Sequence, residues 1–490
     1  MKRQIMGLSK TICRNILVLV VIFGVISACK GQKHKTTIDK GLGISYLDSL
    51  RADKNIPGIS AAITVDGSLV WEYGSGYSDM SQKKEASSHT LYRIASVSKL
   101  ITTAAIAKMV QNNAISFSDD ANQYFRISDN EISIARILSH TSGIRHYYYN
   151  EKIENYPHYD KVSDAVEIFI DDPLESAPGE KFRYSSFGIN LIGAIIEKKS
   201  KQSFEDFVQE NVLRPLKMNH TFMREPKSSK DLSVFYESDQ SVVSEIDLSY
   251  NIPGGGMYST VKDLVKLGDA FLQNSYLKED IKNQLFTNAK LNNGEEVTYG
   301  LGWIVQKLKD GSKVYYHDGH MDGTHSILAI YPKFNTSISI ISNKGSNFGV
   351  TEALELFCKV NTIDNCPEII ADNTNDPELI MKTFQNLSSG FQDFQSAIGT
   401  KDRPKIEGLI SDTFKSGLWP NKNTFTDFLM EIGNEFEVFE QDFTVRGLEN
   451  GENAFVKTIR FQNKYPNKSW FLKYVLNDSQ WSIISIGEYN

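Results

Sequence analysis

The sequence predicts an α+β fold in two parts: a large domain whose sheet joins its two ends, and a smaller α+β domain after it. Three observations support this prediction. Strand-like runs lie at both ends of residues 43–361, helix-like runs lie between them, and residues 362–376 are rich in Asp, Asn and Pro without apolar periodicity. The length of 490 residues is enough for two or three domains.

The first segment predicts export. Basic residues precede an apolar run at 16–26 that is too short to cross a bilayer comfortably, which is typical of a signal peptide. Ile26-Ser27-Ala28-Cys29 resembles a bacterial lipobox, in which the cysteine is acylated after cleavage. We therefore expect a signal peptide at 1–28, a lipid on Cys29, a polar tether at 29–42, and a membrane-anchored lipoprotein of the bacterial cell envelope that faces the periplasm. Ordinary secretion with cleavage after Ala28, or an uncleaved anchor, is the alternative.

Alternating patterns define the large domain. Apolar runs at 59–65 and 69–73 flank Asp66-Gly67-Ser68, which predicts a β-hairpin. Residues 100–110 have the apolar recurrence of a buried helix. Residues 313–316, 326–331 and 337–341 are again strand-like.

Residues 377–490 form the predicted second domain. Apolar residues recur at a spacing of three to four after Pro377, which predicts a helix that starts there. Strand-like runs follow at 436–446, 454–461, 470–476 and 481–486. A helix followed by an antiparallel meander resembles the NTF2-like or cystatin-like domains.

Charge and cysteine content exclude some classes of function. The net charge is −7 and no basic stripe occurs, so nothing favours a nucleic-acid partner. Cys358 and Cys366 are close enough in sequence to close a short loop, but spacing alone does not decide whether they are bonded. No cysteine and histidine spacing indicates a metal site, and we expect no metal or cofactor.

The candidate nucleophile is Ser96. In Ser96-Val-Ser-Lys99 the lysine lies one helical turn after the serine, so both side chains share a helix face. A serine hydroxyl needs a neighbouring base, and a desolvated lysine with a lowered pKa provides one. Four other serines have the same spacing, but only Ser96 follows a strand-like run (91–95) and opens a long apolar helix. Its alternative role is a plain helix cap.

Five further motifs follow in order, and together with 91–99 the set resembles the class C β-lactamase, DD-peptidase and esterase family of penicillin-binding-type serine hydrolases. The motifs are Ile137-Leu-Ser-His-Thr-Ser-Gly-Ile144, Pro178-Gly-Glu-Lys-Phe-Arg-Tyr-Ser-Ser186, Pro253-Gly-Gly-Gly-Met-Tyr-Ser-Thr-Val-Lys-Asp-Leu264, Tyr299-Gly-Leu-Gly-Trp303 and His317-Asp-Gly319. The resemblance implies a transpeptidase-like antiparallel sheet flanked by helices, plus a helical region.

The resemblance also implies roles. Tyr184 is the catalytic tyrosine that relays protons between Lys99, Ser96 and the leaving group, either as a phenol or as a phenolate. The backbone N–H groups of Ser96 and His320 form the oxyanion hole. His317, Gly319 and Ser186 are substrate-binding residues, with Gly319 allowing a close approach of the strand. The glycines at 254–256 and 143 are expected to serve turns.

One departure changes the expected substrate. The family motif Tyr-x-Asn reads Tyr184-Ser185-Ser186 here, and Ser186 is too short to replace the asparagine amide that binds an acylamide carbonyl. We expect an acyl-serine hydrolase of a small-molecule or peptide substrate, with esters or unusual amides favoured over β-lactams and D-Ala peptides. The alternative is a penicillin-fold binding or sensor protein without turnover. Sequence does not indicate the oligomeric state.

Overall fold

The computed structural model describes residues 38–147, 151, 153–370, 397–398, 400–416, 421–432, 436–438, 444–447, 453–461, 470–477 and 480–488. The predicted signal peptide, Cys29, most of the tether, the end of the predicted linker and the predicted helix after Pro377 lie outside these residues. Side chains are described up to residue 410 and at 421–431.

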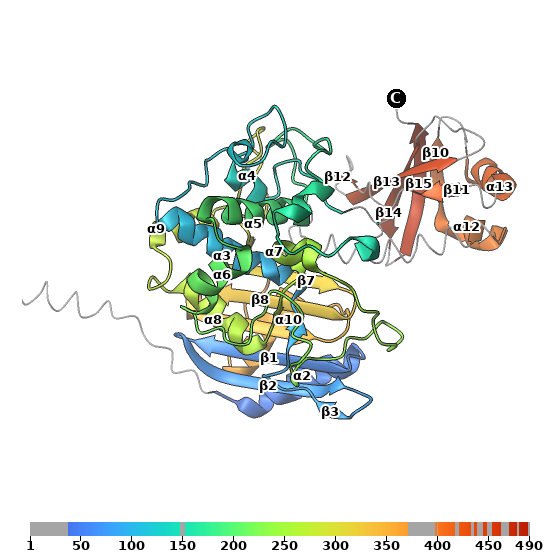
Figure 1. The fold of residues 1–490 in the computed structure, drawn as a ribbon. Coiled ribbons are helices and arrows are strands. Elements are labelled where there is room, and N and C mark those ends of the chain that lie inside the picture. The colour runs from blue at the N-terminus through green and yellow to red at the C-terminus, as the bar shows by residue number, and fades with distance from the viewer. Residues whose placement is uncertain are drawn as a thin grey trace, which may run out of the picture.

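The large domain is built on an antiparallel sheet whose described strands have the order β3-β2-β1-β9-β8-β7-β6 (Figure 1). Its strands are β1 (Gly58–Val65), β2 (Ser68–Asp79), β3 (Lys84–Glu85), β6 (Ile304–Lys307), β7 (Lys313–Met321), β8 (Thr324–Tyr331) and β9 (Thr336–Ser342). The predicted hairpin is confirmed, with Asp66 and Gly67 at φ values of 51° and 73° in its turn. β1 pairs with β9, so the sheet joins the two ends of the domain as expected.

Helices cover both faces of this sheet. They are α2 (Lys40–Asp53), α3 (Ser98–Gln111), α4 (Ile134–Leu138), α5 (Ser186–Ser200), α6 (Phe204–Val208), α7 (Ile252–Gly255), α8 (Val261–Leu272), α9 (Glu279–Leu285) and α10 (Val350–Val360). Almost every residue of α3 is buried, which is why its sequence is apolar on nearly all sides. The predicted helix at 100–110 is therefore confirmed.

Side chains alternate along the strands, so successive residues pack into two different hydrophobic cores. Leu328 and Ile330 of β8 belong to the core that contains α3, α5 and α8. Ile327, Ala329 and Tyr331 point the other way, into the core under α2 and α10. This period of two is the geometry of a strand with both faces covered. The site described below lies on the α3 side.

The predicted strand at 91–95 is shorter than expected. Only Tyr92–Arg93 forms a strand, β4, and it pairs with β5 (Tyr258–Ser259) outside the main sheet. The Ile94 N–H donates to the Met257 carbonyl at 3.0 Å, and the next residue, Ala95, has a φ of 42°. The chain turns there into η1 (Ala95–Val97), a short 3-10 turn that leads into α3.

The C-terminal domain contains a second sheet. Its elements are α12 (Arg403–Leu409), β10 (Ile410–Ser416), α13 (Lys422–Ile432), β11 (Phe436–Val438), β12 (Thr444–Gly447), β13 (Asn453–Phe461), β14 (Trp470–Asn477) and β15 (Gln480–Glu488). The predicted antiparallel meander corresponds to β11 to β15, whereas β10, parallel to β15, was not predicted. An NTF2-like identity for this domain stays a prediction.

Residues 361–370 lie against the large domain. Ile369 bridges to Leu308, and the Lys309 N–H donates to the Glu368 carbonyl. Cys358 of α10 and Cys366 form a disulfide, with their Cα atoms 5.7 Å apart. In the described parts of the chain, no helix combines the length and the apolar character needed to span a bilayer.

Candidate active site

Ser96 lies in the η1 turn at the start of α3. It is partly exposed although its neighbours from Leu91 to Leu100 are buried. The hydroxyl groups of Thr324 and Ser326 on β8 donate to the carbonyls of Arg93 and Ile94, at 2.8 and 2.7 Å. These bonds fix the turn from the sheet side, and the left-handed φ of Ala95 directs the chain so that the next side chain faces outward.

Lys99 lies directly behind Ser96 and is fully buried. Its Nζ lies 3.0 Å from Ser96 Oγ, 3.0 Å from Ser186 Oγ and 2.5 Å from the Gly254 carbonyl. Burial lowers the pKa of Lys99 to about 7, and the negative charge of Asp318 opposes that shift. The amine is therefore close to half protonated at neutral pH.

The geometry fits both protonation states of Lys99. An ammonium has three N–H donors, and three acceptors surround it. A neutral amine donates to Gly254 and Ser186 and keeps its lone pair toward the Ser96 hydroxyl. Ser186 is 2% exposed, and its hydroxyl is directed to Lys99. In this structure, its contact is with the candidate base.

Tyr184 lies on the other side of the nucleophile. Its ring centroid is 4.8 Å from Lys99 Nζ, and its hydroxyl is hydrogen-bonded to Ser96. Burial raises the pKa of Tyr184 well above its usual value, while the Ser96 hydrogen bond opposes this and the charge of Asp318 adds to it. The direction of this shift favours the phenol form of Tyr184 at neutral pH.

Two histidines hold the Tyr184-Ser185-Ser186 segment in place. The Ser185 N–H donates to His140 Nδ1 at 3.2 Å, and the Ser186 N–H donates to His146 Nδ1 at 3.0 Å. Burial lowers the pKa of both rings, that of His146 to about 3, so both are neutral and accept at Nδ1. The sequence does not predict this role, and its one signal is that His140 stands inside the 137–144 motif.

Gly254 also has a larger part than expected. We predicted a turn function, but its carbonyl accepts from Lys99, and its N–H donates to Asn190 at 3.0 Å. A Cβ on Gly254 would lie 2.4 Å from Asn251 Oδ1 and 2.9 Å from the Ser186 carbonyl. Gly143, with a φ of 81°, has the turn geometry that we expected.

Strand β7 forms a wall of the site next to the Ser96 turn. Its segment 317–321 pairs with β8 on one side, whereas β6 pairs only with residues 313–316. A Cβ on Gly319 would lie 2.4 Å from the Ile94 carbonyl and 2.9 Å from Ser96 N. The glycine thus allows the strand to touch the nucleophile turn, and it brings the backbone of His320 next to Ser96.

His317 lies beside Tyr184 with a centroid separation of 6.2 Å and is 2% exposed. Its Nδ1–H donates to the Asp318 carbonyl at 2.5 Å, and its Nε2 is buried without a hydrogen-bond partner. Burial and the charge of Lys99 lower the pKa of His317 to about 3. The ring is therefore neutral, with a lone pair on Nε2.

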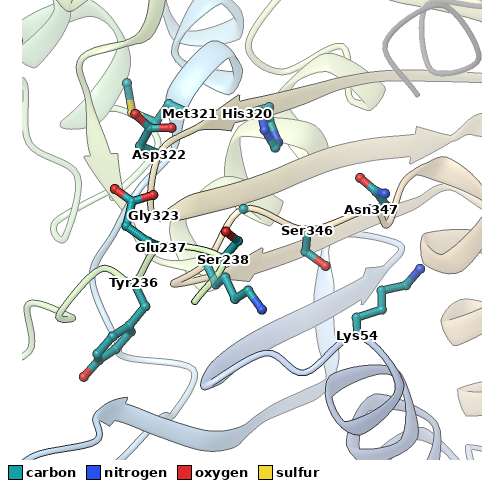
Figure 2. Close-up of a pocket in the computed structure, with 12 residues that line it drawn as sticks. Lys54, Tyr236, Glu237, Ser238, His320, Met321, Asp322, Gly323, Ser346 and Asn347 are labelled. Carbon is teal, nitrogen blue, oxygen red and sulfur yellow. The ribbon is translucent and has the colours of Figure 1, made fainter. Parts of the chain in front are cut away.

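A cavity of about 520 Å³ lies at the end of β7. Figure 2 shows that His320, Asp322 and Glu237 line it together with Lys54 and Ser346. Ser96 and Tyr184 are not among its lining residues, so the cavity adjoins the nucleophile through the backbone of His320.

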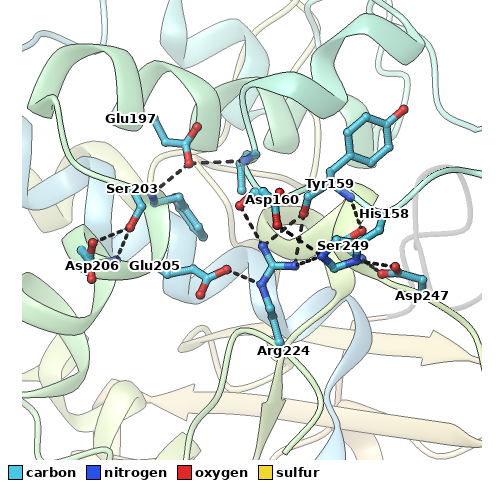
Figure 3. Close-up of polar contacts among 12 residues, drawn as sticks. His158, Tyr159, Asp160, Glu197, Ser203, Glu205, Asp206, Arg224, Asp247 and Ser249 are labelled. Carbon is cyan, nitrogen blue, oxygen red and sulfur yellow. Dashed lines mark hydrogen bonds and ion pairs between the residues drawn. The ribbon is translucent and has the colours of Figure 1, made fainter.

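A polar network anchors the loop that follows the His146 region (Figure 3). Arg224 pairs with Glu205 at 2.7 Å and donates to the Tyr159 and Asp160 carbonyls. Glu197 of α5 accepts from the Ser163 N–H at 2.8 Å. The loop is thereby tied to α5 and α6.

Comparisons with known proteins agree with this geometry. Residues 44–356 match the family model described as Beta-lactamase. Protein flp of Staphylococcus aureus (strain N315) is 29% identical over 310 residues, which are 60% of this chain and 61% of that protein. The chain thus spans less than two thirds of the length of this relative.

Solved structures show the same fold. An octameric penicillin-binding protein homologue from Pyrococcus abyssi has a TM-score of 0.60 at 20% identity, covering 91% of this chain and 95% of that one. A D-stereospecific amidohydrolase from Streptomyces sp. has a TM-score of 0.53 at 20% identity, covering 65% and 98%. The family match spans the whole site, and the chain belongs to the β-lactamase family of serine hydrolases.

Proposed function

We propose that this protein hydrolyses an ester or amide through an acyl-serine intermediate on Ser96. The observation that carries the proposal is the contact of 3.0 Å between Lys99 Nζ and Ser96 Oγ, with Lys99 fully buried and its pKa lowered to about 7. A lysine in this state accepts a proton at neutral pH, which an ordinary surface lysine does not.

The proposed reaction has two halves. Lys99 takes the proton of the Ser96 hydroxyl while Oγ forms a bond to the substrate carbonyl carbon. The phenol of Tyr184 then donates a proton to the leaving group as its bond to the carbonyl carbon breaks, and Lys99 returns a proton to Tyr184. Water attacks the acyl-serine with the same groups acting in reverse, which releases the acid and restores Ser96.

Backbone donors stabilise the negative charge that develops on the carbonyl oxygen. We assign this role to the N–H groups of Ser96 and His320, because Gly319 brings β7 into contact with the Ser96 turn. Each such donor contributes on the order of 10²–10³ in rate.

Ser186 supports a substrate other than a β-lactam. Its hydroxyl accepts from Lys99, so the serine keeps a contact with the base and has no amide to bind an acylamide carbonyl. We therefore propose an ester or a simple amide as the substrate. The similarity in fold to a D-stereospecific amidohydrolase is compatible with an amide.

A fluorophosphonate probe and a panel of para-nitrophenyl esters, nitrocefin and D-Ala-D-Ala peptides test the proposal. We expect labelling and ester hydrolysis by the wild type, and neither with Ser96→Ala. Binding of a panel member with no Ser96-dependent labelling or turnover would instead favour the sensor function that Ser186 keeps open.

We also propose that Cys29 is acylated and anchors the protein in the bacterial cell envelope, facing the periplasm. The support is the lipobox-like Ile26-Ser27-Ala28-Cys29 after an apolar run. Expressed with a palmitate analogue in a bacterial host, the wild type should be labelled and fractionate with membranes. Cys29→Ala should lose both properties, and an unlabelled wild type would contradict the anchor.

A further inference from the structure

Charge around the cleft indicates what kind of substrate it takes. Three carboxylates lie along and beside the end of β7: Asp318, Asp322 and Glu237, together called the acidic rim. The charge of Asp318 opposes the burial that lowers the pKa of Lys99, and it adds to the burial that raises the pKa of Tyr184 and Tyr299. It therefore acts on the reacting groups. Burial lowers the pKa of His320 and the charge of Asp322 opposes this shift. Burial raises the pKa of Tyr147, which lies beside His146, and Asp322 adds to that shift.

Asp322 and Glu237 face the same cavity. Figure 2 shows both carboxylates next to Gly323 on one side of it. Burial and the like charges of Asp322 and Asp239 raise the pKa of Glu237. Among the described residues, neither Asp322 nor Glu237 forms an ion pair with a cationic side chain, although Lys54 and Lys344 line the same cavity.

The lysines of the cavity have other partners. Lys54 Nζ lies 3.5 Å from Glu352, and Lys344 Nζ donates to the Asn55 carbonyl at 3.0 Å. Lys344 is also 8% exposed. Neither ammonium forms an ion pair with a carboxylate of the acidic rim.

His317 adds an independent observation. Its Nδ1–H is used by the Asp318 carbonyl, and its Nε2 is a buried acceptor without a partner. A lone pair at this position accepts from an N–H or O–H group of a ligand and repels a carboxylate. An unsatisfied buried acceptor is unfavourable, and a hydrogen bond from a donating ligand would relieve that cost.

We propose, building on the proposed function, that the cleft selects esters or amides that carry an ammonium group within one side-chain length of the scissile bond. The acidic rim attracts the cation and Nε2 of His317 accepts from a substrate N–H. Substrates with a carboxylate at that position, which include peptides with a free C-terminus and most β-lactams, are disfavoured by the same charges.

The test uses the full-length protein and the para-nitrophenyl esters of ε-aminocaproate, heptanoate and pimelate, which differ only in a terminal ammonium, methyl or carboxylate group. We expect kcat/KM to decrease in that order, with a ratio of about ten or more between the cationic and anionic esters. The ratio should decrease as ionic strength rises from about 0.01 M to about 0.5 M.

Variants locate the effect. The double variant Glu237→Gln/Asp322→Asn should lower the cation-to-anion ratio to about three or less, whereas Glu131→Gln, which removes an exposed carboxylate on another loop, should leave it unchanged. An equal ratio in wild type and double variant, or a preference for pimelate, would overturn the proposal.

Binding of the three esters to the Ser96→Ala variant distinguishes the proposed charge selection from the proposed hydrolysis. This variant cannot form the acyl-serine, so its dissociation constants for the three esters report charge preference without turnover. Tightest binding of the aminocaproate ester supports the acidic rim even if the wild type hydrolyses nothing, a result that would defeat only the proposed function. Equal binding of all three esters overturns the charge selection while hydrolysis by the wild type leaves the proposed function standing.

Discussion

Lys99 is the buried amine on which the proposed proton transfers depend. Ser96, Ser186 and Gly254 are its three polar partners, and they come from three separate parts of the chain. Each partner is a neutral acceptor, and the charge of Asp318 stabilises the ammonium only in part. The balance between burial and these contacts leaves the amine able to gain or lose a proton near neutrality.

Activity should therefore depend on pH through Lys99. Only the neutral amine accepts the Ser96 proton, so kcat/KM for a neutral ester should fall on the acid side with an apparent pKa near 7, the value for Lys99. Steady-state rates between about pH 5 and 9 measure this acid limb of the pH profile, the range in which kcat/KM falls as the pH decreases. An activity that stays constant down to about pH 5 would exclude Lys99 as the base.

Removing the Ser186 hydroxyl should shift that limb. In Ser186→Ala the ammonium of Lys99 loses one of three acceptors, which disfavours the charged form and lowers the pKa of Lys99. We expect the acid limb to move to lower pH by about one pH unit and kcat to fall about tenfold. Ser128→Ala, on a surface loop, is the control, and a pH profile unchanged by Ser186→Ala would show that the contact does not act on Lys99.

The residues of the site were predictable to different degrees. The order of the motifs identified Ser96, Lys99 and Tyr184, which the structure brings together. His140 and His146 were not predicted, because their function is to accept from backbone N–H groups about 40 residues away. Such contacts depend on the path of the loop, which leaves no periodic signal in the sequence.

At the scale of elements, the junction of η1 with β7 determines whether the site forms. Gly319→Ala would place a methyl group 2.4 Å from the Ile94 carbonyl and 2.9 Å from Ser96 N. We expect the strand to move away from the turn, kcat/KM to fall about 10²-fold and stability to fall by about 1–3 kcal/mol. Ester kinetics and urea unfolding measure the two effects.

Gly408→Ala is the matched control for this substitution. Gly408 lies in α12, and a Cβ there would meet nothing within 4 Å. Alanine should leave kcat/KM unchanged and stabilise the helix by up to about 1 kcal/mol. If Gly319→Ala behaved in the same way, the close approach of β7 would not matter for activity.

Elements with a strong repeat were predicted well. The hairpin around Asp66-Gly67 and the strands β7 to β9 match the expected runs, because their apolar residues face two cores. The run at 91–95 misled the prediction, since its apolar residues are buried around a two-residue strand and a turn. Burial alone does not separate a strand from an irregular buried segment.

At the scale of the whole molecule, the disulfide ties residues 361–370 to α10. Replacing both Cys358 and Cys366 by serine removes the cross-link from the unfolded chain, and we expect the free energy of unfolding to fall by about 2–3 kcal/mol. Urea unfolding of oxidised wild type and double variant measures the difference. Wild type treated with a reducing agent should match the variant, and equal stability of all three would contradict the prediction.

The catalytic part should function without the C-terminal domain. Both hydrophobic cores and every site residue lie within residues 38–370. A chain that ends after Ile370 should hydrolyse a neutral ester with kcat/KM within about twofold of the full-length protein. A loss of more than tenfold in a folded truncated chain would assign the C-terminal domain a part in the site.

The pairing of β1 with β9 also affects how the domain is made. β1 ends at Val65, whereas its partner β9 starts at Thr336, so the centre of the sheet is incomplete until almost all of the domain has been synthesised. Contacts so distant along the chain form slowly, since a long loop must close before they contribute. A nascent chain of this topology therefore cannot complete its central sheet until synthesis of the domain is almost finished.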